Sequence, residues 1–449
     1  MIPLSKLSRS LEKREITSRD LVDRALEKIN SPFGEGGRTF LYCNPHKVKA
    51  AADAADKRWK HGQAPSPLNG IPISLKDIFD VKGEITTAGS KLLKNSSPAN
   101  SDAIIVQRLR QAGIVFVGRT NMTEFAYSGI GINTHYGTPK NPFDRKTARI
   151  PGGSSSGAAV SVTDGMASAA IGTDTGGSIR IPAALCGLAG FKPTARRIPN
   201  FGVYPLCKSL DSVGPLAPSV TCCETIDKIL SGDKKIPQQN LSSSRLHIAI
   251  PKNYVVDDLE KHVSLAFEKA VIDLSKTGIK ISEITLTCLS ESHHVNSGGG
   301  IYAEAWAVHK QQFNKCGDHY DPLVASRLRK LNGVPITNYL KAMNARKRLI
   351  AEANIATNGF DAIILPTTPI TAPPIAKILD NEDLYTKTNL RMLKNTFCFN
   401  FLDRCALTIP INDPNTAPCG LMVVGETYGD EKLFFVGKII EKVINQNKE

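Results

Sequence analysis

The chain has 449 residues, of which 41% are hydrophobic and 22% are charged, a balance typical of a globular protein with a sizeable core. This composition excludes a disordered chain, and no apolar run reaches the length of about 18 residues that a membrane span needs. The formal net charge of +14 raises the question of nucleic acid, but the basic residues form no long block, so the charge alone does not indicate such a partner. The polar start "MIPLSKLSRSLEKREITS" has no secretion-signal core, which predicts a cytoplasmic protein.

The first half of the chain predicts alternating helices and strands. In "ITSRDLVDRALEKI", Thr17 followed by Asp20 forms a capping-box pattern, and the apolar residues that follow recur at helical spacing. Residues 101–113 predict a helix that stops at Gly113, and the small-residue segment 157–177 predicts a buried helix followed by a strand. The predicted strands of this half are 71–75, 114–117 and one that ends near Ile171.

The second half begins after the polar segment Ser231–Arg245, the best candidate for a surface linker. Residues 246–284 then predict a strand, a helix and a strand, which is a βαβ unit, and 360–369 predict one more apolar strand. This alternation predicts an α/β fold in which helices cover both faces of a sheet. We expect the linker to be a surface loop within one domain that spans residues 1–449.

Three segments carry residues that could support nucleophilic catalysis. Lys76 ends the apolar strand in "GIPISLKD", a serine loop reads "PGGSSSG", and Ser178 follows a glycine pair in "GTDTGGSIR". Each has an ordinary alternative, because lysines usually lie on solvated faces and glycine-serine segments often form turns. A serine needs a base, and lysine serves as that base in the known alternative to the Ser-His arrangement. His135 is the histidine closest to these motifs, and we expect it to be a structural or pocket residue.

The chain resembles the amidase signature family. The similarity starts at "PLNGIPISLKDIFDVKGEITTAGS" and continues through "PGGSSSGAAVSVTDGMASAAIGTDTGGSIRIPAALCGLAGFKPT", with weaker similarity in "LPTTPITAPP" and "CGLMVVG". The resemblance implies the amidase signature fold, an α/β fold with a large mixed sheet. It also implies hydrolysis of a carboxylic acid amide through an acyl-enzyme. Ser156 departs from the glycine that many members carry, and a serine is small enough to keep the loop.

The resemblance implies a role for each matching residue. Lys76 would be the base, Ser154 a cis-configured serine that relays the proton, and Ser178 the nucleophile. The backbone N–H groups expected to stabilise the oxyanion are those of Thr175, Gly176, Gly177 and Ser178. Supporting hydrogen bonds are expected from Ser155, Asp174 and Arg180. No metal and no organic cofactor is implied, and the expected partner is a small amide.

Three other interpretations compete with this one. Ser10–Lys13 and Lys276–Gly278 match two motifs of penicillin-recognising enzymes, but the third motif is missing because Ala103 follows Ser101-Asp102. A second alternative is the glutaminase component of the tRNA-dependent amidotransferase, whose glutamine-binding residues would correspond to Arg346 or Arg348 and to Asp430. "FAYSGIGINTHYGTPKNPFD" departs from the usual segment of that component, and a nucleic-acid partner is expected only under this alternative. The third alternative is an inactive binding protein on the same fold. The sequence leaves the oligomeric state open.

The cysteine and histidine patterns favour no metal site and no disulfide framework. The ten cysteines form no C-x-x-C pair, which predicts reduced, buried thiols. His293-His294 lies in the polar stretch "SESHHVNSGGG", which we interpret as a surface loop.

Overall fold

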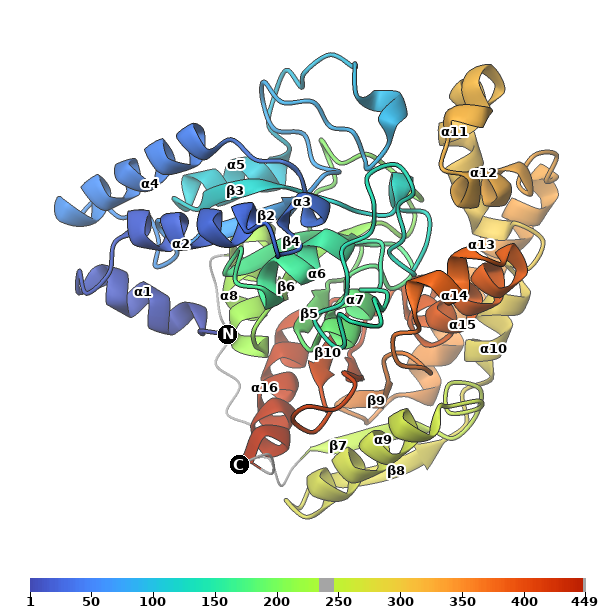
Figure 1. Cartoon of the computed structure of the whole chain (residues 1–449). Coiled ribbons are helices and arrows are strands. Elements are labelled where there is room, and N and C mark those ends of the chain that lie inside the picture. Colours follow the sequence, from blue (N-terminus) through green and yellow to red (C-terminus); the bar gives the residue numbers. More distant parts are fainter. Residues whose placement is uncertain (234–245, 447–449) are drawn as a thin grey trace.

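A single 11-stranded sheet organises the chain, and its strand order is β1-β3-β2-β4-β6-β5-β10-β11-β9-β7-β8 (Figure 1). The computed structural model describes residues 1–233 and 246–446. Its strands are β1 Phe40–Tyr42, β2 Pro72–Lys76, β3 Val115–Thr120, β4 Ala169–Asp174, β5 Ala189–Lys192, β6 Ser212–Ala217, β7 His247–Pro251, β8 Lys280–Ile284, β9 Ala362–Pro366, β10 Ala406–Pro410 and β11 Gly420–Val424.

Helices connect and cover these strands. The α-helices are α1 Leu4–Glu12, α2 Ser18–Asn30, α3 Gly36–Thr39, α4 Pro45–Lys60, α5 Ile104–Gln111, α6 Ser156–Thr163, α7 Arg180–Cys186, α8 Val220–Ser231, α9 Lys261–Ser275, α10 Thr287–His294, α11 Ala303–Cys316, α12 Pro322–Arg329, α13 Ile336–Ala356, α14 Ile375–Leu379, α15 Glu382–Phe401 and α16 Asp430–Gln446. Short 3₁₀ helices lie at η1 Lys91–Leu93, η2 Glu124–Ala126, η4 Gly300–Tyr302 and η5 Gly317–His319.

The sheet is mixed, as the resemblance implies. Strands β3, β2 and β4 are parallel, and so are β9, β7 and β8, whereas β6, β5, β10 and β11 pair antiparallel between these two groups. Parallel neighbours need a crossover connection, and the crossovers contain α5 between β2 and β3, α6 between β3 and β4, and α9 between β7 and β8. The predicted βαβ unit at 246–284 is therefore confirmed.

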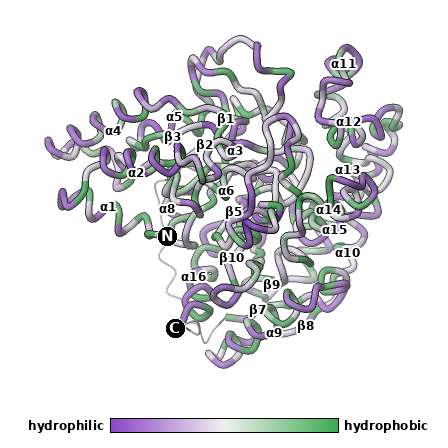
Figure 2. The backbone as a smooth tube through the Cα atoms, viewed as in Figure 1, coloured by the Kyte–Doolittle hydropathy of each residue, from purple (hydrophilic) through white to green (hydrophobic). Residues whose placement is uncertain are grey.

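Both faces of the sheet are buried under helices, which confirms the predicted α/β class. Side chains of a strand alternate between its faces. Ala170 of β4 accordingly packs in an apolar cluster with α6 and α7. Its neighbours Ala169 and Ile171 pack in the main core, to which α8 and α16 contribute. In Figure 2, peripheral helices such as α2 and α4 alternate hydrophilic and hydrophobic stretches along their length.

Most predicted elements are present, but the end of one predicted strand and one predicted loop differ. The Thr17–Asp20 capping box starts α2 as expected. β4 continues to Asp174 instead of ending near Ile171, because its antiparallel pairing with β6 continues to the Asp174–Ser212 pair. His293-His294 form the last turn of α10 instead of a surface loop, because Cys288, Leu289 and Ser292 of that helix are buried.

The proposed linker overlaps the end of α8. Ser231 is the last residue of α8, and Gly232 caps the helix in a left-handed conformation; residues 234–245 lie outside the described part. Strands from both sides of this segment join one sheet. We therefore infer that the chain forms one domain.

The pairing of β2 with β4 brings together two segments that were predicted to carry catalytic residues. These strands run parallel with Leu75 opposite Ile171, so both end at the same edge of the sheet. Lys76 is the last residue of β2, and the loop with Ser178 begins directly after β4. Loops at the carboxyl ends of parallel strands are the usual position of ligand sites in α/β folds.

Candidate active site

Lys76 lies in a fully buried position between two hydroxyl groups. Its Nζ is 2.7 Å from Ser154 Oγ and 2.7 Å from Thr173 Oγ1, and its side chain is 0% exposed. Desolvation lowers the pKa of Lys76 to about 7, although the Asp174 and Asp211 carboxylates act in the opposite direction. A buried lysine without a carboxylate partner loses its proton near neutral pH and can act as a base.

Ser154 belongs to a loop that passes close to other backbone segments. The Gly153–Ser154 peptide bond is cis, the configuration that the resemblance implies. A Cβ at Gly153 would lie 2.5 Å from the backbone nitrogen of Gly131, so only glycine fits. The Ser155 N–H donates to the Ser178 carbonyl oxygen at 3.2 Å. The serine loop and the nucleophile loop, separate in sequence, are thus in direct contact.

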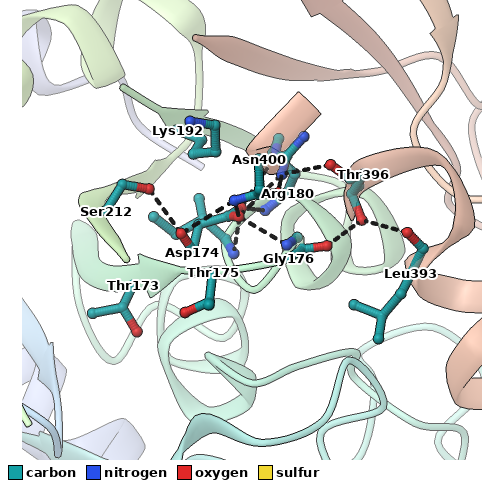
Figure 3. A network of polar contacts seen from close by, with 12 residues as sticks. Thr173, Asp174, Thr175, Gly176, Arg180, Lys192, Ser212, Leu393, Thr396 and Asn400 are labelled. Atoms are coloured by element: carbon teal, nitrogen blue, oxygen red, sulfur yellow. Dashed lines mark hydrogen bonds and ion pairs between the residues drawn. The ribbon is translucent and has the colours of Figure 1, made fainter. Parts of the chain in front are cut away.

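Asp174 organises the loop that carries Ser178 (Figure 3). Its carboxylate accepts hydrogen bonds from the backbone N–H groups of Gly177 at 2.8 Å and Ile179 at 3.1 Å. It also forms a fully buried ion pair with Arg180, in which Nη2 lies 3.0 Å from Oδ1. Burial disfavours the charged carboxylate, but the Arg180 guanidinium outweighs this effect and holds the pKa of Asp174 well below its usual range. The expected supporting contact between Asp174 and Arg180 is present.

Helix α15 supports the same loop from the other side. Thr396 Oγ1 donates to the Gly176 carbonyl oxygen at 2.6 Å, and Asn400 Nδ2 donates to Asp174 Oδ1 at 2.8 Å. A Cβ at Gly177 would lie 2.2 Å from Thr396 Oγ1, and the backbone there has φ +136°. Glycine is required at this position for both reasons.

The N–H groups predicted to stabilise an oxyanion do not all remain available. The Gly177 N–H already donates to Asp174, so the prediction of four free donors is wrong at this residue. Within residues 1–233 and 246–446, the N–H groups of Thr175, Gly176 and Ser178 have no acceptor. Buried N–H groups are nearly always paired, so three unpaired ones in one loop are candidates for binding a substrate oxygen.

Sequence reasoning missed several residues of this site. Thr173 contacts Lys76 directly, and Asp211 accepts a hydrogen bond from the Thr175 hydroxyl. Thr396 and Asn400 lie more than 200 positions beyond Arg180 along the chain. Thr173 lies within the "GTDTGGSIR" motif, but nothing in that motif indicates its contact with Lys76. Asp211, Thr396 and Asn400 belong to no recognisable motif, and only the strand pairing and the packing of α15 bring them to the loop.

The residues proposed for the alternative interpretations lie elsewhere. Arg348 is exposed and pairs with Glu291 and Glu352, while Asp430 accepts hydrogen bonds from Thr194. Arg346 donates to the Phe401 carbonyl oxygen at 2.7 Å. None of the three contacts the Ser178 loop, so these positions do not provide a glutamine site there.

The two penicillin-type motifs also stay apart from the site. Ser10 of α1 donates to Glu15, and Lys276, which follows α9 instead of lying on a strand, pairs with Asp273. His135 contacts the buried carboxylate of Glu124 at 2.9 Å.

None of the ten cysteines forms a disulfide, and eight of them are buried. Among the described residues, no group of three or more His, Cys, Asp or Glu side chains could hold a metal ion. No helix in the described part of the chain is both long and apolar enough to cross a membrane.

Comparisons with known proteins show which family this chain resembles along its length. The Amidase family model matches residues 21–434. A 2-amino-5-chloromuconic acid deaminase from Comamonas testosteroni is 32% identical, over 99% of this chain and 96% of that protein. The A subunit of a glutamyl-tRNA(Gln) amidotransferase from Chloroflexus aggregans is 31% identical, over 98% and 96%. A solved structure described as an amidase has a TM-score of 0.89 and 30% identity, over 98% and 99% of the two chains.

Proposed function

The chain belongs to the amidase family, whose enzymes hydrolyse carbon–nitrogen bonds, and from this we propose that it hydrolyses a carboxylic acid amide through an acyl-enzyme on Ser178. One observation carries the proposal, namely that a fully buried Lys76 with a pKa of about 7 lies 2.7 Å from Ser154 Oγ. Neutral lysine beside a serine is the arrangement needed to activate a second serine.

The proposed reaction begins with proton transfer through Ser154. As Ser178 Oγ attacks the carbonyl carbon, its proton passes to Ser154, and the Ser154 proton passes to the lone pair of Lys76. The tetrahedral oxyanion accepts hydrogen bonds from the N–H groups of Thr175, Gly176 and Ser178, which have no acceptor among the described residues. One such donor typically contributes about 2.7–4 kcal/mol to lowering the barrier.

Collapse of this intermediate expels the amine. Lys76 returns its proton through Ser154 to the leaving nitrogen, which departs as ammonia or an amine and leaves an ester on Ser178. Water then attacks the ester with the same relay acting as base, and the carboxylic acid is released. Every proton removed is returned, so the cycle needs no cofactor.

Replacing Ser154 by alanine should lower kcat by about 10²- to 10⁴-fold, because a positioned proton-transfer group typically contributes in this range. The reaction would retain Ser178 and the three N–H donors. The measurement is steady-state hydrolysis of one amide by both proteins. Ser156→Ala is the matched control, since Ser156 contributes only a 3.5 Å hydrogen bond to the Asn121 carbonyl oxygen. An unchanged kcat in Ser154→Ala would remove Ser154 from the relay.

The purified chain should hydrolyse simple amides without partner proteins or tRNA. The reason is that all proposed catalytic groups come from this one chain, and that Arg346, Arg348 and Asp430 provide no glutamine site at the Ser178 loop. The measurement is ammonia release from a panel of aryl, aliphatic and amino-acid amides that includes glutamine.

The similarity to amidotransferase subunits corresponds to a different result of this measurement. If ammonia were released only from glutamine, and only after partner proteins were added, the chain would be the glutaminase component of an amidotransferase instead. If no amide were hydrolysed and no fluorophosphonate label were incorporated, the chain would be an inactive binding protein on this fold.

A further inference from the structure

The aromatic side chains of Phe397, Tyr302 and Tyr127, here called the aromatic wall, pack beside the nucleophile loop. A Cβ built on Gly176 would lie 3.5 Å from Leu393, 3.6 Å from Phe397 and 3.6 Å from the hydroxyl oxygen of Tyr302. The Tyr302 ring stacks on Phe397, and its centroid is 6.1 Å from that of Tyr127. A substrate whose carbonyl carbon reaches Ser178 therefore passes close to the Tyr302 hydroxyl.

Arg327 of α12 adds a positive charge to this wall. Its Cζ lies 4.1 Å from the centroid of the Tyr127 ring, and its guanidinium donates a hydrogen bond to the Tyr127 carbonyl oxygen. Leu323 of the same helix and Leu393 of α15 pack on one apolar cluster, which holds α12 against the side of the site. The charge of Arg327 also acts electrostatically on Tyr302.

No acidic side chain in the described part of the chain forms an ion pair with Arg327. The nearby carboxylates have other partners. Asp321 accepts hydrogen bonds from Thr134 and from the backbone at the start of α12. Glu304 accepts them from Ser209 and Tyr339. A half-buried guanidinium without a counterion is poorly compensated, and an anionic ligand would supply the missing charge.

The Tyr302 hydroxyl is a second group on the aromatic wall that is available to bind a ligand. It has no hydrogen-bond partner among the described residues. Burial raises the pKa of Tyr302 far above its ordinary value, and the charge of Arg327 opposes this only in part. The hydroxyl therefore stays protonated and is available as a donor.

We propose that Arg327, together with the Tyr302 hydroxyl, binds a carboxylate of the substrate, so that the preferred substrate is an amide that also carries an acidic group. Arginine suits this role because its planar fork matches a carboxylate. The inference rests on the proposed function, since it concerns which amide the Ser178 site accepts.

Binding to the Ser178→Ala protein tests the inference without turnover. The probes are malonamic, succinamic and glutaramic acids, each paired with the neutral amide in which methyl replaces the carboxyl group: propanamide, butanamide and pentanamide. At least one acid should bind about 10- to 150-fold more tightly than its neutral partner, the range expected for hydrogen bonds to a charged group. Calorimetry at pH 8, where all three acids are ionised, measures both dissociation constants.

Two variants in the Ser178→Ala background identify the residue responsible. Arg327→Gln should abolish the preference for the acid, and Arg327→Lys should restore it in part. Arg329→Gln is the matched control, because Arg329 lies on the same helix with its guanidinium over Phe313, and this change should leave the preference intact. If Arg327→Gln does not fold, Tyr302→Phe, which keeps the ring, should weaken binding of the acid alone.

Kinetics on the active enzyme separates binding from a purely structural role. Arg327→Gln should raise KM for the acidic amide and leave kcat nearly unchanged, because the carboxylate is bound equally in the ground and transition states. Equal losses for acidic and neutral amides would show that Arg327 only holds the Tyr127 segment, and would overturn the inference. So would equal affinities for every acid and its neutral partner. If the acids bind selectively but no amide is hydrolysed, the proposed function fails and the carboxylate site stands.

Discussion

Replacing Ser178 with alanine should abolish amide hydrolysis, with a loss in kcat on the order of 10⁶-fold, as expected when a covalent nucleophile is removed. The fold should be retained, because the Ser178 contact with Ser155 uses the backbone carbonyl and the Asp174 network that anchors the loop does not involve the Ser178 side chain. The loss should therefore appear in turnover and not in thermal stability.

The measurement combines kinetics with covalent labelling. A fluorophosphonate probe should label the wild-type protein at Ser178 and leave Ser178→Ala unlabelled, while Ser156→Ala keeps both the label and the activity. Circular dichroism checks that the variant is folded. Turnover near the wild-type rate in Ser178→Ala would show that another residue forms the covalent bond, and the proposed mechanism would be wrong.

Replacing Lys76 with alanine should lower kcat/KM by about 10⁴-fold at pH 7, the upper end of what one acid–base group contributes. In the wild-type protein, Lys76 has a pKa of about 7. Below this pH its amine is protonated and has no lone pair, so it cannot accept the proton of Ser154. Activity should therefore rise as the pH increases through about 7 and level off above it.

The variant should lose this rise and respond instead to base supplied from solution at high pH, which should recover part of the activity. Lys192→Met is the matched control, because Lys192 is also fully buried and desolvation lowers its pKa to about 8. Lys192 donates to the Pro193 carbonyl oxygen and contacts neither hydroxyl of the relay, so the ionisation near pH 7 should remain in that protein. A profile that loses this ionisation in Lys192→Met but keeps it in Lys76→Ala would assign the base to Lys192.

Local patterns in the sequence were sufficient to predict the secondary-structure elements that carry the candidate catalytic residues. Thr17 and Asp20 cap α2 through contacts within three residues, and the apolar run before Lys76 forms β2. Such features depend on neighbours along the chain, which periodicity and turn chemistry report directly. The contact between Lys76 and Ser154 was expected from the resemblance, not from spacing, because the two residues are 78 positions apart.

Reasoning from the sequence predicted the α/β class, the βαβ unit at 246–284 and the motifs that contain Lys76, Ser154 and Ser178. The way in which the antiparallel strands β6, β5, β10 and β11 join the two parallel groups is visible only in the assembled sheet. The assembled fold also brings α15 to the Ser178 loop, which it supports through Thr396. These contacts join segments up to 220 positions apart, and hydrogen bonds and packing over such separations leave no local pattern in the chain.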